Sequence, residues 1–174
     1  MKSFLLTCSL AILLCGCASQ PPLKTVQHVD LKRYSGKWYE IATIPAWFEK
    51  GCHNATAVYT PLPDGRIRVI NRCVTLRGKE SSVTGIATVV PNSGNARLKV
   101  RFGLITGDYD IIALDTTNYR WAVVGHPSRN YLWILSRSPE MDNATYQHLL
   151  TLARENGYTL EKLRKTNQSQ RTSN

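Results

Sequence analysis

The chain lacks the sequence motifs of the common metalloenzyme and nucleotide-binding families. Its 174 residues contain no H-E-x-x-H, no C-x-x-C and no glycine-rich phosphate loop. Such patterns hold catalytic zinc, clustered metal ligands or phosphates in the proteins that carry them. The four histidines are scattered along the chain and adjoin no such motif. We therefore predict no metal site and no cofactor.

Acidic residues are also scarce. The chain has 12 Asp and Glu against 22 Lys and Arg, which gives a net charge of +10. The basic residues do not gather with aromatic residues into a nucleic-acid platform, so we predict no nucleic-acid partner. Two interpretations of the charge stay open. One is a surface that faces anionic lipid head groups, and the other is a cationic surface that only keeps the protein soluble.

No apolar run is long enough to span a membrane as a helix, but the N-terminus has the features of an export signal. Lys2 precedes an apolar stretch at residues 4–14, which has the length of a secretory core and not the roughly 20 residues of a spanning helix. The sequence Leu14-Cys15-Gly16-Cys17 follows and resembles the bacterial lipobox. We predict that residues 1–16 are removed and that Cys17 is lipidated. An ordinary secretory signal is the alternative.

Lipidation of Cys17 would determine the location of the protein. Each buried CH₂ of an acyl chain contributes ~0.8 kcal/mol, so the three chains of a bacterial lipoprotein anchor stably without a spanning helix. Ala18 stands where an Asp would resemble the inner-membrane retention signal. The resemblance therefore implies a lipid anchor in the outer membrane, with the protein facing the periplasm.

The remaining chain has the composition of one globular domain, with 43% hydrophobic and 20% charged residues over the full length. Residues 17–28 are mostly polar, include two adjacent prolines, and predict a tether that begins at the lipidated cysteine. Residues 164–174 contain no apolar side chain and predict a disordered tail. The folded domain is expected at residues 29–163.

Short β-rich runs separated by turn signals predict an all-β domain, either an antiparallel barrel or a sandwich. The sequence Pro63-Asp64-Gly65 and residues 91–95 are strong hairpin turns. Eight strands are expected, at residues 38–44, 55–60, 67–74, 82–90, 97–102, 109–114, 120–125 and 131–136.

One amphipathic helix is expected after the last strand. Asp142 is a good N-cap and Gly157 stands where a glycine ends a helix. Between them a single apolar stripe has helical spacing, at Tyr146, Leu149, Leu150 and Ala153. Residues 131–135 are apolar on both faces, which predicts that this helix covers one face while the other lines the inside of a closed sheet.

Three motifs along these strands resemble the signatures of the lipocalin family, and most closely those of the bacterial lipocalins. Gly36-Lys37-Trp38 matches the first signature, Gly107-Asp108-Tyr109 the second with Gly in place of the usual Thr, and Leu135-Ser136-Arg137 the third. The resemblance covers roughly residues 29–163. It implies an eight-stranded antiparallel up-and-down β-barrel with one C-terminal α-helix packed outside.

The first and third signatures together predict the closed end of the barrel. Trp38 would plug this end, and Arg137 could lie against the indole face in a cation–π contact of ~0.5–2 kcal/mol. Gly36 belongs to the same signature. We interpret these three residues as a structural barrel floor and not as catalytic residues.

Strand parity predicts the residues that line the bore. Glu40 and Ala42 share the parity of Trp38, so we expect both side chains to point inward. Tyr131 and Trp133 share a face on the last strand and are predicted to line the bore higher up. Trp47 lies in the loop after the first strand, which would hang over the open mouth; it completes the list of predicted ligand-binding residues.

Cys52 and Cys73 remain after the signal cysteines and Cys17 are set aside. They flank the hairpin that turns at residues 63–65 and should lie nearly opposite each other. In the oxidising periplasm we predict a disulfide between them, worth roughly 3 kcal/mol in the chain-entropy model. A redox or nucleophilic cysteine, with His53 as the adjacent base, is the alternative.

We expect a lipid-anchored barrel that binds and stores or transports one amphiphilic lipid and catalyses no reaction. The resemblance implies fatty acids, phospholipids or lysophospholipids as ligands, and a role in envelope maintenance under stress. Two alternatives stay open: a lipocalin-fold enzyme that uses a cysteine thiol, and a tethered interaction module, such as a homodimer, with a filled core. Some lipocalins bind haem, which leaves His126 as a candidate ligand.

Overall fold

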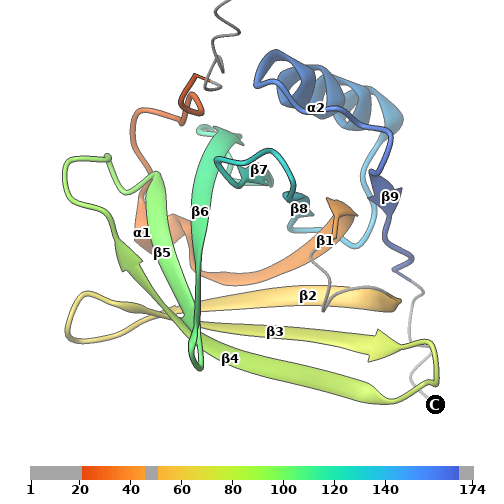
Figure 1. The fold of residues 1–174 in the computed structure, drawn as a ribbon, viewed down its shortest axis with the longest axis horizontal. Helices are drawn as coiled ribbons and strands as arrows, with labels where there is room; N and C mark the ends of the chain where they lie inside the picture. The colour runs from red at the N-terminus through yellow and green to blue at the C-terminus, as the bar shows by residue number, and fades with distance from the viewer. Residues whose placement is uncertain (1–20, 46–50, 169–174) are drawn as a thin grey trace, which may run out of the picture.

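The computed structural model describes residues 21–45 and 51–168, which form a closed antiparallel β-barrel (Figure 1). Each strand pairs with the next in sequence from β2 to β8; β1 then pairs with both β8 and β2 and so closes the barrel. None of the helices in these ranges is both long and apolar enough to cross a bilayer. The barrel strands are β1 (Gly36–Ile44), β2 (Cys52–Pro61), β3 (Ile67–Thr75), β4 (Glu80–Val89), β5 (Arg97–Phe102), β6 (Ile105–Leu114), β7 (Trp121–Gly125) and β8 (Leu132–Ser136).

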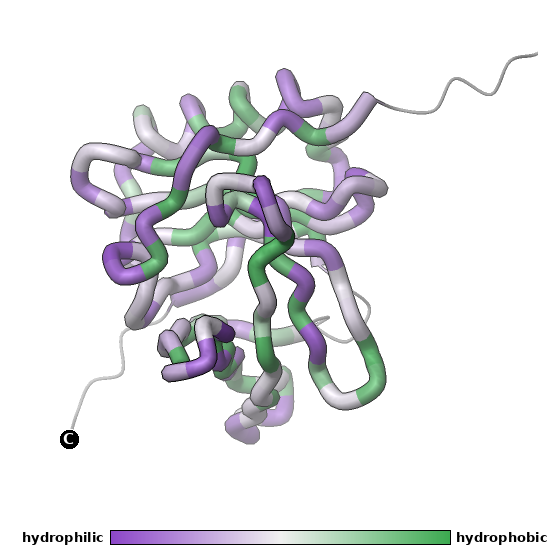
Figure 2. Tube along the Cα trace, turned by 90° about the vertical axis from the view of Figure 1, so that its left-hand side faces the viewer, coloured by the Kyte–Doolittle hydropathy of each residue, from purple (hydrophilic) through white to green (hydrophobic). Residues whose placement is uncertain are grey.

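The predicted fold class is confirmed, and each of the eight predicted strands corresponds to one observed strand. Hydrophobic and hydrophilic residues alternate along the barrel wall (Figure 2), as expected for strands with one face toward the core. β2 and β6 are each four residues longer than predicted; β6 begins at Ile105 and not at residue 109. The additional residues are paired with β5 in a hairpin.

Two helices of the described residues flank the barrel. The short α1 (Leu31–Tyr34) begins after Asp30, whose side chain accepts the backbone N–H groups of Lys32 and Arg33. The longer α2 (Asn143–Glu155) has the predicted N-cap, because Asp142 Oδ1 accepts the N–H of Thr145 at 2.8 Å. The predicted apolar stripe is the buried face of α2, and it packs on the outside of the barrel beside β6, β7 and β8.

The barrel wall separates two hydrophobic clusters, and Ala42 belongs to the outer one. The prediction that Ala42 points into the bore is wrong. The register of β1 against β8 shifts between Glu40 and Ala42, so Ala42 lies opposite Ile134 and packs in the cluster under α2. One extra residue in a strand reverses the parity of every residue beyond it.

Both predicted boundaries of the domain need correction. Residues 164–168, predicted as the start of a disordered tail, are ordered: β9 (Arg164–Lys165) pairs with β1, and Thr166 N–H donates to Ile41 O at 2.9 Å. Beyond Tyr39, β1 no longer pairs with β2, and the tail supplies partners to this free edge. The N-terminal segment also packs on the barrel, since Leu23 is buried and Val26 N–H donates to Ile111 O at 3.0 Å.

Candidate functional site

Trp38 and Arg137 pack against each other where α1 meets the start of β1. Trp38 is fully buried, and the guanidinium carbon of Arg137 lies 3.9 Å from the centroid of the indole ring. Arg137 also donates hydrogen bonds of 2.7–2.9 Å to the carbonyls of Arg33, Ser35 and Lys37. The cation thus ties α1 and the start of β1 to the end of β8. The contact between guanidinium and indole is the one that the sequence predicts, and the role of the pair as a barrel floor stays a prediction.

Gly36 makes the tight turn from α1 into β1. Its φ of +94° is in the region that side chains rarely adopt, and an added Cβ would lie 3.4 Å from Arg137 Nη1. The turn also brings Trp38 Nε1 within 2.7 Å of the carbonyl of Tyr34, to which it donates. Glycine at this position therefore allows the chain to place Trp38 under the guanidinium.

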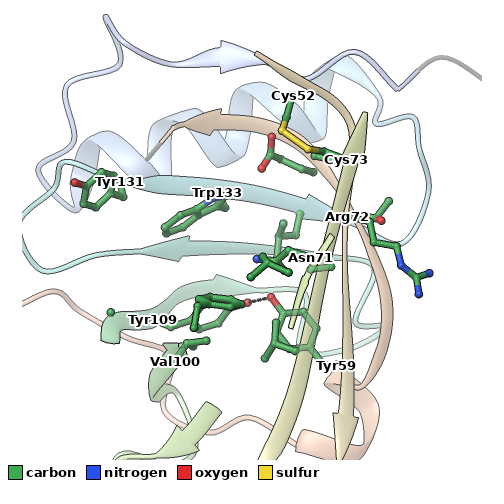
Figure 3. Close-up of a pocket in the computed structure, with 18 of the residues that line it drawn as sticks. Cys52, Tyr59, Asn71, Arg72, Cys73, Val100, Tyr109, Tyr131 and Trp133 are labelled. Carbon is green, nitrogen blue, oxygen red and sulfur yellow. Dashed lines mark hydrogen bonds between the residues drawn. A yellow bond between two sulfur atoms is a disulfide. The ribbon is translucent and has the colours of Figure 1, made fainter. Parts of the chain in front are cut away.

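Three tyrosine hydroxyls form a chain near the bottom of the bore. Tyr109 O–H lies 2.7 Å from the hydroxyls of both Tyr34 and Tyr59, and Figure 3 shows the bond between Tyr59 and Tyr109. Burial raises the pKa of Tyr34 and of Tyr109 well above its ordinary value, so both phenols stay neutral. This cluster is not predicted from the sequence, although Tyr109 belongs to the second signature.

Above this chain lies a cavity of about 340 Å³ inside the barrel. Its walls are mainly apolar and include Val69, Val100, Phe102 and Leu135. Of the predicted ligand-binding residues, Glu40, Tyr131 and Trp133 line the cavity. Ala42 does not, for the reason given above, and Trp47 lies outside the described residues.

Trp133 and Tyr131 form an aromatic wall on one side of the cavity. Their rings are stacked with centroids 6.4 Å apart, and both project into the space between the strands in Figure 3. The intervening residue, Leu132, packs instead under α2. The doubly apolar strand thus has the two-sided role that its sequence predicts.

Two acceptor groups of different kinds face the cavity. Asn71 Oδ1 is buried and has no hydrogen-bond partner among the described residues, which is costly unless a donor reaches it. The Glu40 carboxylate already accepts a hydrogen bond from the hydroxyl of Thr166. Asn71 was missed by the sequence analysis, because a polar residue within a strand carries no local signal of its direction. Arg72, its neighbour, also contributes to the cavity lining, while the guanidinium end of its side chain extends away from the other labelled residues in Figure 3.

His126 lies at the cavity rim beside Asp108. Its Nε2 is 3.9 Å from Asp108 Oδ2, and its Nδ1 is 2.9 Å from Ser128 Oγ. Both ring nitrogens therefore have polar neighbours, which does not favour a haem ligand. Within residues 21–45 and 51–168, no three His, Cys, Asp or Glu side chains are placed to hold a metal ion.

Cys52 and Cys73 are joined by a disulfide between β2 and β3, with 5.6 Å between their Cα atoms. Both line the cavity. The register of the two strands shifts between His53 and Thr56, where Asn54 has a φ of +52°. Because the bond uses both thiols, the described part of the chain offers no free cysteine as a nucleophile.

A family model described as a lipocalin-like domain matches residues 29–168, which is most of the chain. The chain belongs to the lipocalin family. This lipocalin is 37% identical over 163 residues to the outer membrane lipoprotein Blc of Vibrio cholerae, covering 92% of this chain and 94% of that one. It is 40% identical over 157 residues to Blc of Escherichia coli K12, covering 87% and 88%.

Relatives outside bacteria match as well. Temperature-induced lipocalin-1 of Arabidopsis thaliana is 41% identical over 157 residues, which covers 84% of this chain and 83% of that one. Insecticyanin of the tobacco hornworm Manduca sexta shares the fold, with a TM-score of 0.70 at 21% identity over 86% of each chain. Lipocalins bind small hydrophobic ligands, which supports a small-molecule partner for this chain.

Proposed function

We propose that this lipocalin is a lipid-anchored outer-membrane protein that binds one amphiphilic lipid, to store it or move it during envelope maintenance under stress. The mainly apolar cavity inside the barrel carries the proposal. An acyl chain that enters it leaves water at a gain of ~25 cal/mol per Å² of apolar surface, offset by the cost of immobilising the chain. A tethered module with a filled core would leave no such space.

The polar groups of the cavity favour a ligand that carries a hydrogen-bond donor. Asn71 Oδ1 lacks a partner in the described structure, and a hydroxyl, an ammonium or a protonated carboxyl group could donate to it. The tail would lie against Val100, Phe102 and Leu135, which line the same cavity. Fatty acids, lysophospholipids and phospholipids are the ligand classes that combine such a head with such a tail.

The proposed location in the outer membrane is supported by the sequence around Cys17 and by the names of the bacterial relatives. The Vibrio and Escherichia homologues are named outer membrane lipoproteins, and Cys17 ends a sequence that resembles a lipobox. We propose that Cys17 carries the acyl chains and that the barrel faces the periplasm. The disulfide between Cys52 and Cys73 fits that oxidising compartment.

Mass spectrometry of the full chain, extracted from its own membranes under mild conditions, tests the proposal. The denatured protein is expected to begin at Cys17 with three acyl chains attached. The native protein is expected to carry one additional lipid that dissociates on denaturation, and the same spectrum shows whether it is a monomer or a homodimer. An unmodified Cys17 would refute the anchor, and a barrel that never retains a lipid would refute the carrier.

Replacing Trp133 with alanine should weaken lipid binding by about tenfold, because one indole face of the cavity wall is lost. The measurement is a titration with a fluorescent fatty acid. Trp121→Ala is the matched control, since Trp121 packs on the outer cluster beside His148 and not in the cavity. Equal affinities of the two variants would remove Trp133 from the binding site.

A further inference from the structure

We propose that the open end of the barrel docks onto the surface of an anionic phospholipid bilayer through its β3–β4 and β5–β6 hairpins. This inference rests on the proposed function, because it gives the cavity a direct route to membrane lipid. Its three supports are exposed apolar side chains, nearby cations that form no ion pair within the described part of the chain, and the short tether.

The exposed large hydrophobic residues of the described chain all lie on these hairpins or the strands that they join. Leu76 is 84% exposed in the turn between β3 and β4, and Leu104 is fully exposed in the turn between β5 and β6. Val83 and Ile105 are 43% and 57% exposed, and both also line the cavity. The apolar rim is therefore continuous with the cavity wall, which is unusual for a surface that faces only water.

Beside this rim, part of the edge of β4 extends past the end of β5 and has no partner there. β4 pairs with β5 only from Ile86 onward, so residues 80–85 of β4 have no strand partner on the β5 side. Val83 stands on this free edge, and Ile105 begins the strand beyond it. A lipid tail that passes between the two hairpins could stay in contact with apolar side chains along its whole path.

Basic side chains surround the apolar rim. Arg72, Arg77, Lys79 and Arg101 are exposed, and none of them forms an ion pair within the described residues. Lys99, by contrast, is paired with Asp108. Four cations beside exposed leucines match an anionic interface, where each basic residue near the surface is worth about 1 kcal/mol.

The tether brings this side of the barrel to the membrane. The carbonyl of Pro21 accepts a hydrogen bond from Arg129, in the loop between β7 and β8 that also supplies the cavity-lining residues His126 and Tyr131. Four peptide units separate Cys17 from Pro21 and span about 14 Å at most. In Figure 2 the start of the described chain and the β5–β6 hairpin, with its green tip, lie on the same right-hand side of the barrel.

The test is co-sedimentation of residues 17–174 carrying Cys17→Ser with lipid vesicles, so that no anchor contributes. This chain retains every described element of the fold. We expect binding to vesicles of phosphatidylethanolamine with phosphatidylglycerol, weaker binding at high salt, and little binding to phosphatidylcholine alone. The double variant Leu76→Asp with Leu104→Asp should lose about tenfold or more in partitioning. The triple variant Arg77→Gln, Lys79→Gln and Arg101→Gln should lose the part of vesicle binding that high salt weakens.

Thr116→Asp with Thr117→Asp is the matched control, because it adds the same charges to the exposed loop between β6 and β7 at the floor end. It should bind vesicles like the parent. A parent chain that does not sediment with anionic vesicles, or an aspartate pair at Leu76 and Leu104 that sediments like the parent, would overturn the docking. Fatty-acid titration of the same proteins without vesicles reports the cavity separately, since neither leucine lines it.

Discussion

Replacing Trp38 with alanine should lower the melting temperature of this lipocalin by about 10 °C or more. Truncation of a buried Trp typically costs about 3–5 kcal/mol, and each kcal/mol corresponds to roughly 2–4 °C in a domain of this size. Trp38 is fully buried, and Arg137 stacks on it. The variant also leaves the guanidinium without its aromatic face while the hydrogen bonds to α1 remain.

Thermal unfolding followed by circular dichroism measures this effect. Trp133→Ala is the matched comparison, because Trp133 is only partly buried and borders empty cavity space; its loss should cost clearly less stability while it lowers lipid affinity. The two tryptophans should therefore separate stability from binding. A melting temperature that stays at the parent value in Trp38→Ala would contradict the role of this residue as the barrel floor.

Removing the disulfide with Cys52→Ser and Cys73→Ser should cost about 3 kcal/mol of stability, which is the chain-entropy value for a loop of this size. The two cysteines are 21 positions apart and join β2 to β3 beside a register shift. Backbone pairing is interrupted there, so the covalent bond holds the two strands where the ladder is weakest. The measurement is denaturant unfolding of parent and variant.

Reducing agent supplies the control for this prediction. It should lower the stability of the parent by a similar amount and leave the double serine variant unchanged. If the parent unfolds at the same denaturant concentration with and without reductant, the bond does not contribute to the folded protein. Thiol titration of the unreduced parent should find neither Cys52 nor Cys73 reactive.

Local patterns in the sequence determined the strands and helices of this protein, and they identified the residues at the ends of α2. The apolar stripe of α2 lies between Asp142 and Gly157, and a helical period needs no knowledge of distant residues. The alternation in residues 131–135 assigned Trp133 to the bore because β8 contains no irregularity. The floor pair of Trp38 and Arg137 came from family signatures, 99 positions apart, rather than from any local period.

Only the tertiary structure decided the features that depend on how separate strands meet. The shift after Glu40 appears when β1 is paired with β8, and it turns Ala42 from the bore to α2. β9 forms because β1 has a free edge with which it can pair. The polar sequence of the tail gives no indication of this partner. Asn71 Oδ1 is buried without a donor among the described residues because the strands of the barrel surround it. Periodicity is a property of one segment, whereas strand register, free edges and enclosure depend on how several segments pair. The pairing of segments therefore determined the shape and the polarity of the cavity.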